Sequence, residues 1–404
     1  MGHECGGRAG RENGDDVRDT TLKIAMLGTR GVPASYSGFE TCVEELGRRL
    51  VQRGHQVTVY CRSHHIRYRR PYYRGMRLVR LPTLANKYLD TLLHSLISSV
   101  HALGQGFDIG LYFIAGNSPV TWIPRLAGTR TLLNVDGLDW KRDKWPAAAK
   151  RYIQAAEYLA TVLPDVFLTD SRVVQDYYAR RYGKKPPYIP YGSEVTPEPP
   201  GETLARWGLA PRGYVLFVGR LVPENCVHHL VAAFRRLDTP MKCVIVGDAP
   251  YADAYKRQLR NVAGNDPRIV FTGYLFGRGY RELGSNAAVF VETSGVGGTH
   301  PALLEAMALG NCVVVNDTRE NLETIGAAGL AYEGDAGAPA LRRVLAVLLR
   351  DPDTVAAFRR KALERVRQCF QWESVTDSYE RLFYRLCRRP IPARLCVSNQ
   401  TMTP

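Results

Sequence analysis

The sequence lacks the features that define several common classes of protein. No run reaches the roughly 18 apolar residues of a membrane-spanning helix. The nine cysteines are odd in number, scattered and without a Cys-x-x-Cys pair, which favours reduced thiols over disulfides or a metal site. Residues 1–21 are polar and Gly-rich, without the apolar segment of a secretory signal, so we expect a disordered tail in a cytoplasmic protein.

Acidic residues are missing from one part of the chain. The formal net charge is +15, and no Asp or Glu occurs between Leu46 and Leu89. Arginines there are interleaved with tyrosines and histidines, a mixture that suits phospholipid headgroups or RNA. Since no RNA-binding motif is present, we expect an anionic membrane surface and no nucleic acid as partner. Further basic residues of the same kind lie near the end of the chain: Arg385, Arg388, Arg389 and Arg394.

An apolar stripe at helical spacing follows this basic region. Between Leu84 and Leu103 it comprises Leu89, Leu92, Leu93, Leu96, Ile97 and Val100. Such a stripe packs in a core or lies against a membrane. We expect it to pack in the core.

Short apolar runs alternate with helical patterns, as in parallel sheets covered by helices on both faces. The expected strands of the first half are 22–27, 56–61, 76–81, 109–114, 131–135, 166–169 and 187–189. Those of the second half are 214–218, 242–246, 269–272, 288–291 and 312–315. Helices are expected at 40–52, 227–236, 252–262, 300–309 and 372–388. The sequence therefore predicts an α/β protein with two doubly wound, Rossmann-like halves.

A Pro-rich polar segment at 191–212 interrupts the alternation and reads as a linker. We expect a first domain over 22–195 and a second over 211–370. The helical pattern at 371–389 is long enough to cross back onto the first domain, and 390–404 would form a tail.

A Gly-rich segment directly follows the first expected strand. It begins Gly28-Thr29-Arg30-Gly31 and continues to Gly38, where a helix is expected. Ligands of open α/β sheets bind outside the carboxyl ends of the strands, and glycines there let backbone N–H groups approach a phosphate or a sugar. A purely structural turn would also explain some of these glycines.

A second segment places possible anion-binding groups at a helix start. Gly297 and Gly298 precede Thr299, a candidate N-cap, and Pro301 fits the first turn. The free N–H groups of such a helix start are able to hold a diphosphate. Glu305 lies one turn further on, where its carboxylate would accept hydrogen bonds from ribose hydroxyls. A capped amphipathic helix with a surface glutamate is the plainer interpretation.

A third segment, Gly219-Arg220-Leu221, ends the first strand of the second half. Arginine presents a fixed fork of donors to phosphate oxygens. A surface arginine is the alternative.

In this order the three segments resemble the retaining family-4 glycosyltransferases of the two-Rossmann-domain (GT-B) fold. The stretches 27–41, 134–145 and 188–192 are similar to those of a subgroup with bacterial capsule and exopolysaccharide rhamnosyltransferases. The resemblance covers residues 22–388. It implies two domains facing a central cleft, the first for the acceptor and the second for a nucleotide sugar.

The resemblance also implies roles for individual residues. Glu305 would bind the ribose, Arg220 would neutralise the diphosphate, and Asp136 would line the cleft from the first domain. No cofactor and no metal are implied beyond the dTDP- or UDP-linked donor. The remaining substrate-binding candidates are Gly28, Arg30, Gly31, Gly219, Asn225, Gly298, Thr299, His300 and Pro301, with His300 either touching the donor sugar or only ending the helix.

Two positions depart from the pattern of many family members. Gly297 stands where an acidic residue is common, and Asn225 stands where a lysine is common. A different donor, such as a deoxysugar with fewer hydroxyls, or a loss of activity would account for both. The subgroup's own pattern favours a different donor.

The implied function is transfer of a hexosyl group with retention, rhamnosyl from dTDP-rhamnose being the specific candidate. No pair of carboxylates is placed as in hydrolases, so we expect front-side attack assisted by the leaving diphosphate. The acceptor would be a lipid-linked saccharide at the inner face of the plasma membrane, in surface polysaccharide synthesis. The alternatives are a non-catalytic nucleotide-sugar-binding protein and a nucleotide-sugar epimerase of the same fold.

Overall fold

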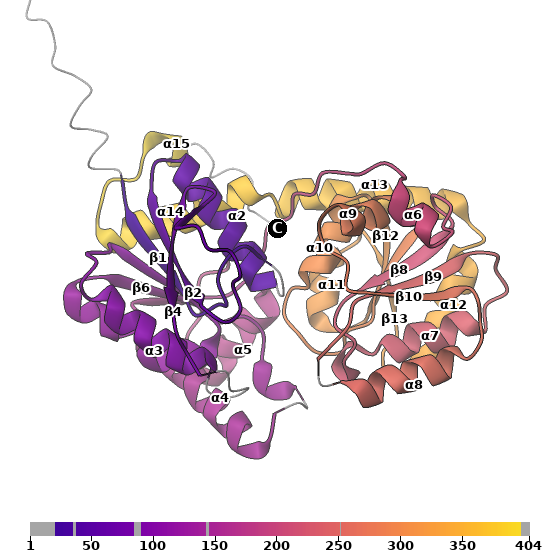
Figure 1. Ribbon diagram of the computed structural model, residues 1–404, viewed down its shortest axis with the longest axis horizontal. Helices are drawn as coiled ribbons and strands as arrows, with labels where there is room; N and C mark the ends of the chain where they lie inside the picture. The colour runs from indigo at the N-terminus through magenta and orange to yellow at the C-terminus, as the bar shows by residue number, and fades with distance from the viewer. Residues whose placement is uncertain (1–20, 35–37, 85–89, 143–144, 251, 397–404) are drawn as a thin grey trace, which may run out of the picture.

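Two α/β domains make up the protein, as the sequence predicts. The computed structural model describes residues 21–34, 38–84, 90–142, 145–250 and 252–396. Each half of the chain forms one sheet with helices packed around it, and the two domains lie side by side (Figure 1). The predicted tail at 1–21 falls, except for Thr21, outside the described residues.

The first sheet has the strand order of a doubly wound fold. Its order is β3-β4-β2-β1-β5-β6-β7, in which only the edge strand β3 is antiparallel to its neighbour. The topological switch point lies between β1 and β5, which both pair in parallel. The strands are β1 (Lys23–Leu27), β2 (Gln56–Arg62), β3 (Tyr72–Tyr73), β4 (Met76–Leu81), β5 (Ile109–Phe113), β6 (Arg130–Asn134) and β7 (Val166–Leu168).

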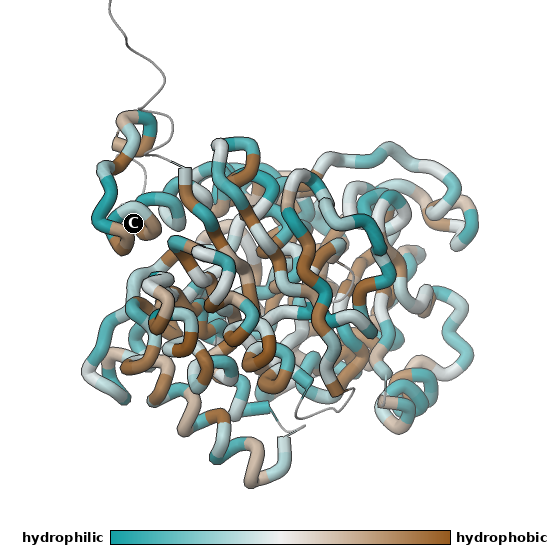
Figure 2. The backbone as a smooth tube through the Cα atoms, turned by 60° about the vertical axis from the view of Figure 1, so that its left-hand side comes forward, coloured by the Kyte–Doolittle hydropathy of each residue, from teal (hydrophilic) through white to brown (hydrophobic). Residues whose placement is uncertain are grey.

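The second sheet repeats this arrangement in the order β10-β9-β8-β11-β12-β13, with its switch point between β8 and β11. Its strands are β8 (Tyr214–Val218), β9 (Lys242–Val246), β10 (Ile269–Gly273), β11 (Val289–Glu292), β12 (Cys312–Asn316) and β13 (Leu330–Tyr332). Strands such as β12, CVVVN, are buried at every residue. Because helices cover both faces of a parallel sheet, its strands are continuous apolar runs, and hydrophobic residues concentrate in the interior (Figure 2).

Helices connect the strands in both domains. Those of the first domain are α2 (Gly38–Gln52), α3 (Asp90–Ala102), α4 (Ala147–Ala160) and α5 (Arg172–Tyr182), with the 3₁₀ turns η1 (Ala115–Val120), η2 (Ile123–Ala127) and η3 (Asp139–Lys141). Those of the second are α6 (Glu202–Arg206), η4 (Pro223–Asn225), α7 (Val227–Arg235), α8 (Asp253–Ala263), α9 (Gly277–Asn286), α10 (Pro301–Ala308), α11 (Arg319–Ile325), α12 (Ala338–Leu348) and α13 (Pro352–Cys369). No helix within these described ranges is both long and apolar enough to span a lipid bilayer.

The C-terminal helix α14 (Trp372–Cys387) returns to the first domain and packs on α2 (Figure 1). Its buried face includes Val375, Tyr379 and Phe383, which recur at helical spacing and join the same core as strand β1. The crossover predicted from the sequence is therefore present.

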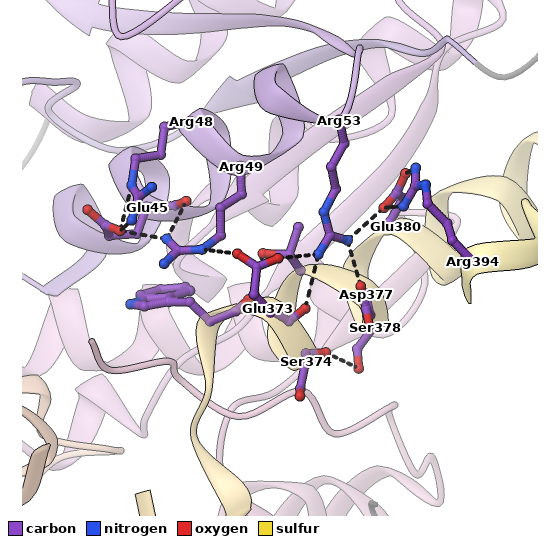
Figure 3. Close-up of polar contacts among 12 residues, drawn as sticks. Glu45, Arg48, Arg49, Arg53, Glu373, Ser374, Asp377, Ser378, Glu380 and Arg394 are labelled. Atoms are coloured by element: carbon purple, nitrogen blue, oxygen red, sulfur yellow. Dashed lines mark hydrogen bonds and ion pairs between the residues drawn. The ribbon is translucent and has the colours of Figure 1, made fainter. Parts of the chain in front are cut away.

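Ion pairs fasten α14 to α2 (Figure 3). The guanidinium of Arg53 pairs with Glu373 at 2.6 Å, Asp377 at 2.6 Å and the fully buried Glu380 at 2.9 Å. Arg49, which is 2% exposed, pairs with Glu373 at 2.9 Å. These arginines belong to the acid-free region of the sequence, so acidic residues more than 300 positions away neutralise part of its charge.

The structure adds the short strands β3 and β13, which were not predicted, and differs from the sequence-based elements at three further segments. Residues 187–189 form no named strand and contribute only an isolated bridge between Tyr188 and Thr169. Inside the predicted linker, α6 packs on α9, where Glu282 accepts the N–H groups of Gly201 and Leu204 at 2.8 Å. In the predicted C-terminal tail, α15 (Ala393–Cys396) buries Leu395 in the first domain's core.

Candidate active site

The loops at the two switch points lie where doubly wound sheets bind ligands. In the first domain they follow β1 and β5 and begin at Gly28 and Ile114. In the second they follow β8 and β11 and begin at Gly219 and Thr293. Crevices outside the carboxyl ends of these strands are the expected ligand sites of this fold.

The Gly-rich loop after β1 requires glycine for packing. Gly28 and Gly31 have φ values of 92° and 104°. A Cβ on Gly28 would lie 2.6 Å from the Nδ2 atom of Asn117, and one on Gly31 would collide with Cys61. Both positions of this loop therefore require glycine for structural reasons.

The backbone of the same loop is held by the following helix. The N–H of Arg30 donates to Glu40 on α2 at 3.1 Å, and the N–H of Gly31 donates to the hydroxyl of Thr29 at 3.2 Å. These two N–H groups, which the sequence suggests for substrate, already have partners inside the protein. The turn interpretation accordingly explains part of this motif.

The loop after β8 positions Arg220. The side-chain amide of Asn225 donates to the backbone carbonyl of Arg220 at 2.8 Å. The backbone carbonyl of Asn225 accepts a hydrogen bond from the Thr293 hydroxyl at 2.5 Å. Gly219 approaches Gly247 so closely that a Cβ on Gly247 would overlap the Gly219 carbonyl. Asn225 is therefore a buried brace of the Arg220 loop, a role that does not need the positive charge of lysine.

The helix α10 begins differently from the sequence prediction. Its N-cap is His300, with no side-chain capping bond, and Pro301 occupies the first turn as predicted. Thr299, expected as the N-cap, instead donates its hydroxyl to the backbone carbonyl of Asp170 at 3.2 Å. The expectation for Thr299 is wrong because the opposite domain offers its hydroxyl a partner across the cleft.

His300 explains why residue 297 lacks a side chain. A Cβ on Gly297 would lie 2.6 Å from the Cε1 atom and 2.8 Å from the Nε2 atom of His300. The imidazole therefore occupies the space that an acidic side chain at 297 would enter. The departure at Gly297 is therefore accompanied by the His300 ring, which fills the vacated space.

The first domain covers the start of α10. A Cβ on Gly137 would lie 2.7 Å from the backbone N of Gly298, and one on Gly298 would lie 3.2 Å from the carboxylate of Asp136. Asp136 has a left-handed φ of 58° although it is not a glycine. Its N–H donates to the side chain of Asn134 at 3.1 Å. The two backbones thus meet in the cleft at the predicted diphosphate position.

Two carboxyl groups lie together at this meeting point. Burial raises the pKa of Asp136 to about 6, and the nearby Asp139 adds to the rise, while the charge of Arg220 opposes it. Burial, reinforced by Asp136, raises the pKa of Asp170 well above its usual range. Asp170 was not among the residues predicted from the sequence, although its place after a buried strand was a usable signal.

We expect Asp170→Asn to raise the free energy of unfolding at pH 8 by on the order of 1–3 kcal/mol, because the amide stays neutral whereas the buried carboxyl must either ionise or hold a proton that the unfolded chain releases. Asp170 is 3% exposed, and its Oδ1 atom has no hydrogen-bond partner in the described part of the chain. An acid with a raised pKa binds more protons folded than unfolded, so its ionisation destabilises the protein as pH rises. Urea unfolding should show a smaller gain at pH 5. Asp176→Asn, on the exposed side of α5, is the control, and an equal gain in that variant would contradict the assignment.

Glu305 lies in a cavity further along the cleft. The cavity measures about 300 Å³ and is lined from both domains and from α14. The carboxylate of Glu305 accepts a hydrogen bond from the hydroxyl of Tyr280 on α9, a residue that the sequence analysis missed. Burial raises the pKa of Glu305. The lining also includes Thr41, Tyr191, Arg281 and Pro301.

A second contact across the cleft was also not foreseen. Glu323 on α11 accepts hydrogen bonds from the Ser171 hydroxyl at 2.8 Å and from the N–H groups of Arg172 at 2.7 Å and Val173 at 3.1 Å. A carboxylate at the N-terminus of a helix is favourable because it satisfies free donors and the helix dipole. The second domain thus supplies the cap of α5 in the first.

Metal-ligating side chains gather at one other place in the described ranges. Ligand atoms of His64, His65 and Asp90 lie within 4.8 Å of one another. Arg62 donates to the same Asp90 oxygen at 2.8 Å, so a guanidinium already neutralises that carboxylate.

Comparison with known proteins agrees with this geometry. The fold, with its two facing Rossmann-like domains and returning helix, defines the class as GT-B. A family model described as "Glycosyl transferase 4-like domain" matches residues 37–192, and one described as "Glycosyl transferases group 1" matches residues 212–351. Together these models cover most of the chain, which therefore belongs to the GT-B glycosyltransferase families that they describe.

Individual relatives are more distant. The chain is 27% identical over 191 residues to O-antigen chain mannosyltransferase B of Escherichia coli, covering 46% of this chain and 50% of that protein. It is 28% identical over 200 residues to alpha-maltose-1-phosphate synthase of Mycobacterium tuberculosis, covering 46% and 52%. The matches thus span about half the length of these curated relatives.

Solved structures share the fold at low identity. Sucrose-phosphate synthase from Thermosynechococcus elongatus has a TM-score of 0.76 and 22% identity, over 90% of this chain and 99% of that one. Anabaena HepE in complex with UDP-glucose has a TM-score of 0.73 and 16% identity, over 90% and 100%. These likenesses establish the arrangement of both domains around the cleft.

Proposed function

We propose that the protein transfers a hexosyl group from a nucleotide sugar to a saccharide acceptor. The observation that carries this proposal is the line of groups along the cleft of a glycosyltransferase fold: Arg220, the start of α10 and Glu305. The family match covers both domains, and HepE, of the same fold, was solved with UDP-glucose. Glu305 would accept the ribose hydroxyls, with Tyr280 fixing the orientation of its carboxylate.

The donor is a dTDP- or UDP-linked hexose, for which we favour rhamnosyl. The supporting observation is the pairing of Gly297 with the His300 ring. An acidic side chain at 297 would be a hydrogen-bond partner for sugar hydroxyls, whereas the imidazole presents a flat, partly apolar surface. A deoxysugar has fewer hydroxyls to satisfy and suits that surface better.

The reaction proceeds with retention by front-side attack in this proposal. The bond between the anomeric carbon and the diphosphate oxygen breaks, the acceptor oxygen bonds to the same face, and the leaving diphosphate takes the acceptor proton. Arg220 and the N–H groups at the start of α10 stabilise the negative charge that develops on the diphosphate. Asp136 lies opposite that helix start and would orient the acceptor.

The acceptor is a lipid-linked saccharide of surface polysaccharide synthesis, met by a cytoplasmic, peripherally bound enzyme at the inner face of the plasma membrane. The mannosyltransferase relative is named for an O-antigen chain, which supports a polysaccharide product. A nucleotide-sugar epimerase is the second candidate. The paired carboxyl groups of Asp136 and Asp170, both with raised pKa values, favour it as possible acid and base.

Thermal unfolding with nucleotides tests the proposal. We expect dTDP or UDP at 100 times its dissociation constant to stabilise the wild type by about 2.7 kcal/mol. Glu305→Ala should abolish this shift, whereas Glu364→Ala, an exposed glutamate on α13, should retain it. A wild type that no nucleotide stabilises would rule out the donor site. A nucleotide shift without transfer to any acceptor, but with conversion of the donor to its epimer, would favour the second candidate.

A further inference from the structure

The helix α3 presents its apolar side to solvent. Its fully buried residues are His94, Ser95, Ser98, Ser99 and Ala102, whereas Leu96 is 40% and Val100 54% exposed. Part of the apolar stripe predicted to pack in the core therefore faces outward: Leu92 packs against the core as predicted, but for Leu96 and Val100 the prediction is wrong. Leu89, the first residue of the stripe, lies outside the described residues.

Local contacts explain this orientation. At the start of α3, Asp90 pairs with Arg62 at the end of β2 at 2.8 Å. Further along, the small side chain of Ser99 lets the helix approach the sheet and bonds the buried hydroxyl of Tyr112 at 2.6 Å. The inward face is thus lined mostly by polar and small residues, and Leu96 and Val100 are left on the outside.

The orientation does not serve the domain's own stability. The hydroxyl oxygens of Ser95 and Ser98 are buried without a hydrogen-bond partner in the described part of the chain. Burying such groups costs free energy, and exposing leucine and valine forgoes the gain from burial. This arrangement of α3 is favourable if a binding partner covers the outer face of the helix.

Apolar exposure continues beside α3. The helix packs against η2, where Trp122 is 44% and Leu126 72% exposed. Contiguous exposed apolar patches mark interaction sites in soluble proteins. We name Leu96, Val100, Trp122 and Leu126 the outer apolar face; α3 lies on the side of the first domain away from the second (Figure 1).

Unpaired positive charge lies on the loop that reaches the start of α3. The loop after β2 brings His64 and His65 to the start of α3, at Asp90. The same loop carries three exposed arginines, Arg67, Arg69 and Arg70, whose side chains form no ion pair or hydrogen bond among the described residues. In contrast, the arginines toward α14 are neutralised.

We propose that the outer apolar face, together with Arg67, Arg69 and Arg70, is the surface by which the protein docks on an anionic lipid bilayer. Exposed apolar side chains match the acyl boundary of such a surface, and unpaired arginines on the same domain match its negative headgroups. A second copy of the chain would bring like charges together, so the charge favours lipid. The inference rests on the proposed function, since a lipid-linked acceptor is what makes the docking useful. The arginines of α2, together with Arg389 and Arg394, were predicted to form part of the membrane-binding surface, but their charges are paired within the protein and they are not part of the proposed docking surface.

Flotation of the full chain with vesicles tests the surface. The wild type should bind phosphatidylcholine vesicles that contain phosphatidylglycerol and should not bind pure phosphatidylcholine. Val100→Glu should weaken binding by about tenfold or more, because it removes an inserted apolar group and adds a repelled charge. Val347→Glu, at a 72% exposed valine of α12 in the second domain, is the matched control and should bind like the wild type.

The arginines are tested in the same way. Arg69→Glu with Arg70→Glu should lower affinity for the anionic vesicles by about tenfold or more, whereas the adjacent exposed pair on α12, Arg342→Glu with Arg343→Glu, should have little effect. Equal losses in both pairs would show unspecific charge attraction and overturn the proposal.

Two further readouts separate the possible failures. If the wild type does not bind anionic vesicles, the proposed docking surface is wrong. If the molecular mass in solution of Val100→Glu is half that of the wild type, the face is an interface with a second copy of the chain instead. Nucleotide-induced thermal stabilisation, measured on the same samples, reports on the donor site alone. Vesicle binding without nucleotide stabilisation would support the docking surface and contradict the proposed function. Nucleotide stabilisation without vesicle binding would support the proposed function and contradict the docking surface.

Discussion

Replacement of Arg220 by alanine is expected to lower kcat for sugar transfer by about 10²–10³. The arginine lies in the loop after β8 at the switch point, this loop is braced by Asn225, and the arginine's charge acts on the cleft carboxyl of Asp136. Charge that develops on a leaving diphosphate needs compensation mainly in the transition state. The expected loss therefore falls on kcat more than on KM.

A matched variant separates this effect from a general loss of positive charge. Arg236→Ala removes an exposed arginine at the end of α7 and should leave both kinetic constants unchanged. Initial rates over a range of donor concentrations give the two constants for each variant. An Arg220→Ala enzyme that keeps its kcat would remove the arginine from the proposed chemistry.

The second large effect concerns the joint between α2 and α14. We expect Glu380→Ala to lower the free energy of unfolding by about 3–5 kcal/mol, because removing one partner leaves buried charges uncompensated. Glu380 is fully buried and accepts hydrogen bonds from His55 at 2.7 Å, Arg53 at 2.9 Å and Arg394 at 2.8 Å. Denaturant unfolding followed by a probe in the first domain measures the change.

The same helix supplies the control for Glu380. Glu373 also pairs with Arg53, but its side chain is 65% exposed, so Glu373→Ala should cost about 1 kcal/mol or less. Similar losses in the two variants would show that burial is not what makes the joint strong.

Acid should weaken the joint in a defined range. Burial alone would raise the pKa of Glu380, but hydrogen bonds from Arg394, His55 and Arg53 outweigh it and lower the pKa to about 2. A lowered pKa stabilises the fold above the ordinary value for glutamate, and this stabilisation is lost as pH falls toward 2. The difference in the free energy of unfolding between the wild type and Glu380→Ala should therefore become smaller as the pH falls through that range.

Local pattern was enough to predict most of the fold. The apolar runs predicted nearly all of the strands. The glycine, arginine and proline residues that follow strand ends marked the loops at the switch points, because these residues are adjacent in sequence to the strands that position them. For the segment at 187–189 the pattern failed, because the chain makes only a single bridge there.

Features that depend on distant partners were beyond such reasoning. Periodicity showed that α3 has two faces, but the inward face was decided by Arg62 and Tyr112 from other strands. Charge counting in the region 46–89 overlooked the carboxylates on α14 that neutralise Arg53. The hydroxyl of Thr299 had an obvious local use as a cap and found another partner in the opposite domain.

The return of α14 to the first domain also bears on how the protein is made. Chains leave the ribosome from the N-terminus, and domains commonly fold in that order. Here the core around β1 includes Val375, Phe383 and Leu395, so the domain synthesised first is completed last. Until those residues emerge, the nascent first domain keeps the α2 surface of Arg49 and Arg53 uncovered, while the second domain already has its whole sheet. A prematurely terminated chain would thus be recognisable to cellular quality control by an unfinished first domain, however well its second domain had folded.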